Sequence, residues 1–221
     1  MKFRFACLLL LPMLAFGQSS KPIIDNDRVT VWDTTWTKAE PASGERSFSA
    51  PPDYDVLTVW LTGGDIATSL PGGKSRVVKH KVGDAVFTAK GARLPETWDG
   101  AGATPRTVVI ALKDHAVPPI PNPSGLPLAF PRPGAKKLID NNRILVWDYT
   151  WTPGEETPMH FHDKDVVVVY LEDGDLTSVT PDGKSTVNPY KFGDVRFNFA
   201  NRSHKEVVSK GNQRAIITEL K

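Results

Sequence analysis

The chain repeats itself at the scale of a whole small domain. Ile23–Thr37 reads IIDNDRVTVWDTTWT and Leu138–Thr152 reads LIDNNRILVWDYTWT, so ten of fifteen positions are identical at an offset of 115 residues. Two later pairs of segments match at offsets of 110 and 108 residues, namely Gly64–Phe87 with Gly174–Phe197 and Arg106–Lys113 with Arg214–Lys221. A period of about 110 residues is too long for a solenoid unit and suits a small domain. The sequence therefore predicts two copies of one fold.

Each copy is predicted to be all-β. Segments rich in Val, Trp and Thr occur at the same place in both copies, Arg28–Trp36 and Arg143–Trp151. Short apolar runs, Asp55–Leu61 and Asp165–Leu171, are followed by glycine turns, and turn signals recur every eight to twelve residues. No stretch shows a sustained helical period. This spacing is typical of a β-sandwich or β-barrel.

A proline-rich segment separates the copies. Asp114–Lys137 holds seven prolines and reads as an extended linker, because proline disfavours helices and central strands. Its apolar residues indicate that it packs along a domain. We therefore expect an N-terminal domain at 18–113, a linker at 114–137 and a C-terminal domain at 138–221.

The first residues are predicted to be an export signal. Lys2 and Arg4 precede an apolar stretch to Phe16, and small residues place cleavage after Gly17, giving a signal peptide at 1–17. An uncleaved membrane anchor is the alternative, which the short apolar stretch disfavours. We expect a periplasmic or secreted protein.

Composition excludes several function classes. The only cysteine is Cys7, so the mature chain has no disulfide, thiolate metal site or cysteine nucleophile. Removing Lys2 and Arg4 leaves 25 basic residues (27 less 2) against 25 acidic ones. A net charge near zero without a basic cluster argues against nucleic acid, or a membrane after signal cleavage, as the partner. A small-molecule ligand is expected, and a homodimer is left open.

Three histidines form the strongest candidate site. His160 and His162 are two residues apart, so on a strand both point to one face, and His204 lies about forty residues downstream. Three imidazoles leave open coordination positions, as working metal sites do. The alternative is three histidines that bind no metal. Fe, Mn, Zn and Ni all suit such ligands.

The first copy serves as an internal comparison. The positions matching the three histidines are Ala50, Pro52 and Leu94, so no metal is expected there. Residues shared by both copies are assigned to the fold: Trp32/Trp147, Asp33/Asp148, Trp36/Trp151, Gly83/Gly193 and Phe87/Phe197. Residues special to the second copy are weaker site candidates: Met159, Tyr149, Tyr170, Arg196, Asn198 and Phe199.

These motifs resemble the cupin superfamily, and the duplication resembles a bicupin. The first cupin motif, G-x5-H-x-H-x(3,4)-E-x6-G, matches Gly154, His160, His162 and Gly174, with Val167 where glutamate is expected. The second motif, G-x5-P-x-G-x2-H-x3-N, is matched with substitutions by Gly193, Phe199, Asn201, His204 and Val208. The resemblance implies two tandem jelly-roll (double-stranded β-helix) barrels, with a metal held inside the second.

The resemblance leaves the fourth ligand open. Val167 cannot bind a metal, and Glu206, two residues past His204, is the obvious substitute. The first copy has Glu96 at the matching place without metal ligands around it, so we interpret Glu206 as structural.

Three functions are compatible with this sequence. A three-histidine centre resembles the iron-dependent dioxygenases of the superfamily, and with another metal it would support isomerisation or hydrolysis. A non-catalytic protein that binds a metal or a small ligand is the second reading, and a structural or assembly protein is the third. No acid or base beyond the ligands is identifiable, so the catalytic residues are unknown.

Overall fold

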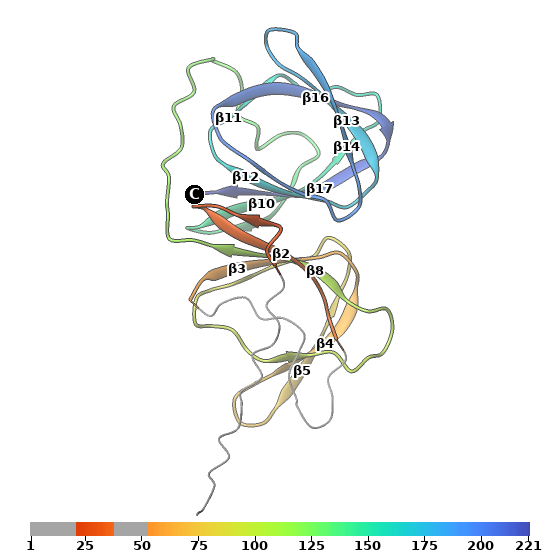
Figure 1. The fold of residues 1–221 in the computed structure, drawn as a ribbon. Coiled ribbons are helices and arrows are strands. Elements are labelled where there is room, and N and C mark those ends of the chain that lie inside the picture. The colour runs from red at the N-terminus through yellow and green to blue at the C-terminus, as the bar shows by residue number, and fades with distance from the viewer. Residues whose placement is uncertain (1–20, 38–52) are drawn as a thin grey trace, which may run out of the picture.

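The computed structural model of the protein describes residues 21–37 and 53–221 (Figure 1). The predicted signal peptide, its cleavage after Gly17, and the positions Ala50 and Pro52 lie outside the described residues. Across the described ranges the chain forms seventeen strands, and none of its segments is a helix long and apolar enough to cross a membrane. The predicted all-β class is confirmed.

Each copy contributes two antiparallel sheets. In the first copy a five-stranded sheet has the order β1-β2-β8-β3-β6 and a three-stranded sheet the order β5-β4-β7. Their bounds are β1 Ile24–Asp25, β2 Val29–Thr35, β3 Asp55–Trp60, β4 Gly64–Ser69, β5 Ser75–His80, β6 Ala85–Thr88, β7 Glu96–Thr97 and β8 Arg106–Leu112.

The second copy repeats this arrangement. Its five-stranded sheet has the order β15-β12-β17-β10-β9, and a four-stranded sheet has the order β11-β16-β13-β14. Their bounds are β9 Lys136–Asp140, β10 Ile144–Trp151, β11 His160–His162, β12 Val166–Tyr170, β13 Gly174–Val179, β14 Ser185–Tyr190, β15 Val195–Asn198, β16 Arg202–Gly211 and β17 Gln213–Leu220. Corresponding strands follow one another in the same order in both copies.

The valine run of β12 is continuous because the strand is buried on both faces. Val167 and Val169 join a hydrophobic cluster that includes first-copy residues, whereas Val166 and Val168 join a second cluster inside the second copy. Side chains alternate along a strand, so a strand covered on both sides needs apolar residues at every position. This strand therefore belongs at once to a barrel interior and to the contact between the copies.

One hydrophobic core joins the two copies. The large sheets face each other in the middle of Figure 1, with β2, β3 and β8 on one side and β10, β12 and β17 on the other. Val29, Leu57 and Ile110 from the first copy share this core with Ile144 and Ile216 from the second, all fully buried. Burying each such side chain is worth roughly 1.5–3 kcal/mol, so the copies form one stable body.

Polar contacts across this interface are reciprocal. Arg28 of the first copy pairs with Asp165 of the second at 3.2 Å, and Arg143 of the second pairs with Asp55 of the first at 3.3 Å. The two arginines occupy matching positions in the repeat, as do the two aspartates. The interface therefore has an internal two-fold relation.

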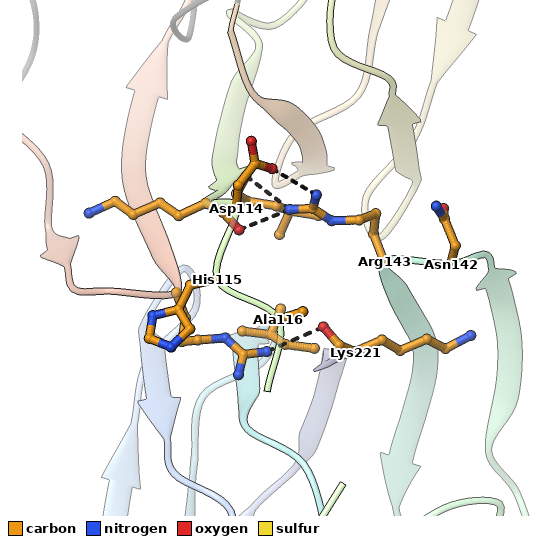
Figure 2. Close-up of a pocket in the computed structure, with 10 residues that line it drawn as sticks. Asp114, His115, Ala116, Asn142, Arg143 and Lys221 are labelled. Carbon is orange, nitrogen blue, oxygen red and sulfur yellow. Dashed lines mark hydrogen bonds and ion pairs between the residues drawn. The ribbon is translucent and has the colours of Figure 1, made fainter. Parts of the chain in front are cut away.

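Arg143 also holds the segment that leaves the first copy. Figure 2 shows Asp114 accepting a hydrogen bond of 2.9 Å from Arg143, beside His115 and Lys221. These residues line a cavity of about 260 Å³ between the copies. Its arginines are already paired, so the cavity is part of the interface rather than a charged ligand site.

Two glycine turns that occur in both copies allow the copies to approach closely. Gly83 and Gly193 have φ values of +85° and +87°, a region that favours glycine. A Cβ atom on Gly83 would lie 2.7 Å from Nη2 of Arg214, and one on Gly193 would lie 2.8 Å from Nη2 of Arg106. Each glycine therefore leaves the space that an arginine side chain of the opposite copy occupies.

The proline-rich segment packs on the second copy, along the strand that carries two of the histidines. The Phe161 amide donates to the Pro127 carbonyl at 2.9 Å, and the Ala129 amide donates to the Phe161 carbonyl at 2.9 Å. In Figure 1 the segment rises in green beside the second copy and reaches β11. The packing predicted from its apolar residues is confirmed, and the segment adds a short parallel edge to β11.

Candidate metal centre

Strand register brings the three histidines together. β11 pairs antiparallel with β16, and in this register His160 lies directly opposite His204 while His162 lies opposite Arg202. Directly opposed residues of an antiparallel pair project from the same face. His160 and His162 share that face because they are two residues apart.

The three imidazoles converge at short distances. His160 Nε2 and His162 Nε2 are 3.2 Å apart, and ring centroids are separated by 4.7–5.0 Å. One nitrogen of each ring lies within 4.8 Å of the others, and within residues 21–37 and 53–221 this is the one such group that can hold a metal. Two nitrogens bound to one ion at about 2.1 Å are separated by roughly 3.0–3.4 Å. The spacing of the His160 and His162 nitrogens therefore fits a divalent ion, and His204 lies near enough to be a third ligand.

Burial keeps His160 and His162 uncharged near neutral pH. The three side chains are 3%, 6% and 7% exposed. Burial lowers the pKa of His160 to about 4, and it lowers the pKa of His162 well below its usual value, with nearby Arg202 adding to the effect. Neutral imidazole is the form that binds a metal.

Contacts around the rings match the needs of a metal ligand. The Pro158 carbonyl lies 2.8 Å from His160 Nδ1, and since a carbonyl can only accept, Nδ1 carries the hydrogen and Nε2 is left with its lone pair. Among the described residues, His204 Nε2 is buried without a hydrogen-bond partner. An unpartnered buried nitrogen beside two other imidazoles points to a missing ligand.

A left-handed turn places His204. Asn201, in the glycine position of the second motif, has a φ of +59°, and its amide donates to the His162 carbonyl at 2.9 Å. Asparagine is one of the few side chains that tolerate this conformation. The substitution therefore preserves the turn that leads into β16.

Glu206 lies beside the cluster but outside the group of three nitrogens. Its Oε1 is 3.4 Å from His204 Nε2, without hydrogen-bond direction, and its Oε2 accepts from Trp151 Nε1 at 3.1 Å. Burial would raise its pKa, but His204, Arg132 and His160 outweigh burial and hold the pKa well below the usual value. Glu206 is thus a carboxylate next to a ligand-type ring, and its interpretation as a structural residue stays a prediction.

Val167 is not the residue that faces the site. Its side chain lies in the core between the copies, and Val166 lines the cavity next to His162 instead. The motif allows three or four residues between its second histidine and its glutamate. The longer spacing leads to Val167, whose side chain points away from the site, and the shorter one leads to Val166. Neither valine supplies a carboxylate.

A small polar cavity of about 140 Å³ adjoins the histidines. His162 and Glu206 line it together with Arg132 and Arg202. Of the weaker candidates, Tyr170 and Asn198 line it and Tyr149 packs behind it on Arg132. Arg196 and Phe199 are exposed, and Met159 is half-buried outside the lining.

Several lining residues escaped prediction from the sequence. Arg202 corresponds to Ala92 in the first copy, so the comparison of copies could have found it. Trp151 is shared by both copies and was assigned only to the fold, yet it binds Glu206. Arg132 belongs to the segment that separates the two copies in the sequence. It has no counterpart in the repeat, so a comparison of the copies could not find it.

The first copy differs at the same place. Leu94, which matches His204, is 37% exposed and lines a cavity of about 290 Å³ with Arg76, His80 and Glu96. The other two matching positions lie outside the described residues.

No family model matches the chain. A Pseudomonas aeruginosa protein called β-alanine degradation protein BauB is 33% identical over 99 residues, which are 44% of this chain and 99% of that protein. The solved structure of a cupin 2 conserved barrel domain protein from Leptotrichia buccalis covers 91% of this chain and 88% of its own, with a TM-score of 0.52 and 14% identity. The chain belongs to the cupin superfamily.

The likeness extends over both copies and confirms the bicupin fold, with two tandem jelly-roll barrels. An oxalate decarboxylase of Bacillus subtilis with Mn(II) centres matches this bicupin with a TM-score of 0.51 and 11% identity, covering 87% of this chain and 69% of that one. At this identity the likeness shows the fold alone. The histidine cluster of the present bicupin stands on its own geometry.

Proposed function

We propose that this bicupin is an exported metal-dependent enzyme that acts on a small molecule in its C-terminal barrel. His160, His162 and His204 bind one divalent ion. The convergence of three buried imidazoles, with one nitrogen of each within 4.8 Å of the others, carries the proposal. The proposed domains are 18–113, without a metal, and 138–221, with the metal, joined by the linker 114–137, after a signal peptide at 1–17.

A bound divalent ion supplies Lewis-acid activation, and iron also supplies oxygen chemistry. The protein supplies the rest: three imidazole ligands that leave coordination positions open, and a small cavity lined by His162. Glu206 places a negative charge 3.4 Å from His204 Nε2. The relative named for β-alanine degradation makes a short carbon skeleton a reasonable first substrate to test.

Metal analysis of protein purified from its own exported compartment tests the proposal. We expect about one ion of Fe, Mn, Zn or Ni per chain in the wild type and none in His204→Ala. Protein made in a foreign cytoplasm is unsuitable. A metal that is abundant there, or that binds more tightly in the Irving–Williams order, can occupy the site in place of the native metal. Equal metal content in wild type and His204→Ala would contradict the proposal.

Turnover is tested on the same material. An oxygenase consumes oxygen in a metal-dependent way with its substrate, whereas an isomerase converts substrate without oxygen. A wild-type protein that holds its ion tightly but converts none of the short carboxylic and amino acids supplied would favour a binding role instead.

A further inference from the structure

One arginine enters the second barrel from outside it. Arg132 follows the segment that pairs with β11, and its side chain is 7% exposed. Its guanidinium carbon lies 4.5 Å from the ring centroid of Phe130, 4.1 Å from that of Tyr149 and 5.6 Å from that of Trp151. Aromatic faces hold the cation in place through its charge but leave its N–H groups without oxygen acceptors.

Arg132 has buried donors to spare. Within residues 21–37 and 53–221, its Nε and Nη1 atoms have no hydrogen-bond partner. The nearest carboxylate oxygen, Glu206 Oε2, is 3.5 Å from Nη1 and already accepts from Trp151. A buried charged donor left without an acceptor is unfavourable, so the arrangement is complete only when another acceptor is present.

The charge of the cavity calls for an anion. Arg132, Arg202 and Glu206 line it, two cations against one carboxylate. Arg202 is turned to other partners, since its Nε donates to the Phe199 carbonyl at 3.0 Å and its Nη1 lies 3.5 Å from His204 Nδ1. Arg132 is thus the cation with unused donors, and a divalent ion on the histidines would increase the positive charge further.

Size and chemistry narrow the ligand class. The cavity of about 140 Å³ admits only a small molecule, and Ser178, Asn198 and Tyr190 offer polar contacts for its uncharged part. A planar guanidinium matches a carboxylate in shape and hydrogen bonding. We propose that Arg132 binds the carboxylate of a short-chain carboxylic acid beside the three histidines. This names the substrate class of the proposed function and rests on it only for the contact with the metal.

The test is the affinity of the full chain for propionate, with propionamide as the uncharged molecule of the same shape. Binding is followed by NMR titration of ¹³C-labelled ligand, and the metal content of each sample is measured. We expect propionate to bind the wild type at least tenfold more tightly than propionamide or inorganic phosphate does. Arg132→Met should weaken propionate binding at least tenfold, whereas Lys210→Met, an exposed control on the same barrel, should change it less than twofold.

Arg132→Lys keeps the test valid if the methionine variant does not fold. Lysine retains the charge but lacks the planar fork, so propionate binding should weaken at least threefold. Unchanged affinity in either folded variant, or a preference of the wild type for propionamide or phosphate, would overturn the inference.

Titrating metal-free and metal-loaded protein separates the two proposals. Propionate binding that depends on Arg132 in a protein that takes up no metal would support this inference while the proposed function fails. A protein that takes up its metal but binds propionate independently of Arg132 would support the proposed function and overturn this inference. A wild type that binds no propionate in either form would overturn the inference.

Discussion

Glu206 contacts a histidine of the candidate metal centre without being part of the three-histidine group. Its carboxylate faces His204 through one oxygen and Trp151 through the other. The hydrogen bond from Trp151 holds the carboxylate in place beside His204. A negative charge at this distance also favours a cation among the imidazoles.

Glu206→Gln should therefore weaken metal binding by roughly tenfold, because the amide keeps the shape but loses the charge. A metal titration with a competing chelator measures the effect. Glu156→Gln is the matched control, since Glu156 is an exposed residue of the same barrel that pairs with Lys205. Equal affinities of Glu206→Gln and wild type would show that Glu206 has no influence on the metal.

Glu219 makes stability depend on pH. Burial raises the pKa of its carboxyl, although Trp147 Nε1 donates to it at 2.8 Å. A raised folded-state pKa means that the folded protein holds this proton more tightly than the unfolded chain. Stability from this group is therefore complete below the unfolded value near 4.5 and is lost as pH rises through the folded pKa.

Glu219→Gln should remove this loss, because glutamine is uncharged and its oxygen can still accept from Trp147. Urea unfolding at pH 4 and pH 7.5 should show the variant gaining about 1 kcal/mol relative to wild type at the higher pH. Glu155→Gln, an exposed residue, should show no such gain. A variant that is less stable than wild type at pH 7.5 would contradict this assignment.

At the residue scale the histidines were predictable and Arg132 was not. Spacing along a strand places His160 and His162 on one face, and the second copy alone carries them. Arg132 reaches the cavity only because its segment pairs with β11, and that pairing depends on contacts that the local sequence does not encode.

At the scale of elements, tight turns fix how closely the two barrels approach. Gly193 turns the chain between β14 and β15 and contacts Arg106 of the first copy, which Asp33 holds through bonds of 3.0 and 2.6 Å. Gly183 has a similar φ, +82°, with open space around its Cβ position. Both positions resist a side chain through their backbone conformation, but Gly193 also lacks room.

Gly183→Ala should cost about 1 kcal/mol of stability, and Gly193→Ala at least about 1 kcal/mol more, because Arg106 cannot yield without losing Asp33. Chemical unfolding of the two variants isolates the close contact from the shared backbone strain. Similar losses in both would mean that Arg106 moves aside freely.

The proline-rich segment is attached to β11 by one parallel bridge and two backbone hydrogen bonds. Amides of Ala129 and Phe161 should therefore exchange with deuterium slowly, whereas the exposed turn around Gly125 should exchange much faster. Exchange measured residue by residue by NMR checks this. Fast exchange at Ala129 would detach the segment, and with it Arg132, from the second barrel.

The spacing of turns and the β-rich composition predicted the strands, but they did not predict that β12 is buried on both faces. An unbroken valine run fits a buried strand in several settings, and only the packing of the copies shows which face meets which core. The misplaced role of Val167 is the direct result.

At the scale of the whole molecule, reciprocal ion pairs align the barrels around an apolar core. The Arg28–Asp165 pair is the more buried, with side chains 8% and 12% exposed against 25% and 16% for Arg143–Asp55. Removing one partner of a buried pair leaves an uncompensated charge, which costs more than losing an exposed pair.

Arg28→Met should cost about 3 kcal/mol and Arg143→Met about 1 kcal/mol. Urea unfolding measures both, and Arg28→Met combined with Asp165→Asn should recover part of the loss. A larger loss in Arg143→Met than in Arg28→Met would show that the burial of each pair does not decide its contribution to stability.

The repeat predicted two copies, whereas their face-to-face packing required the structure, because an apolar strand face gives no sign of its partner. We propose that the second barrel binds a metal through three histidines, which the first barrel does not have at the matching positions. Anomalous diffraction at the metal edge from crystals of the loaded protein tests this difference. We predict one peak per chain, about 2.1 Å from a nitrogen of each of His160, His162 and His204. A peak elsewhere, or none at these rings in fully loaded protein, would contradict the account.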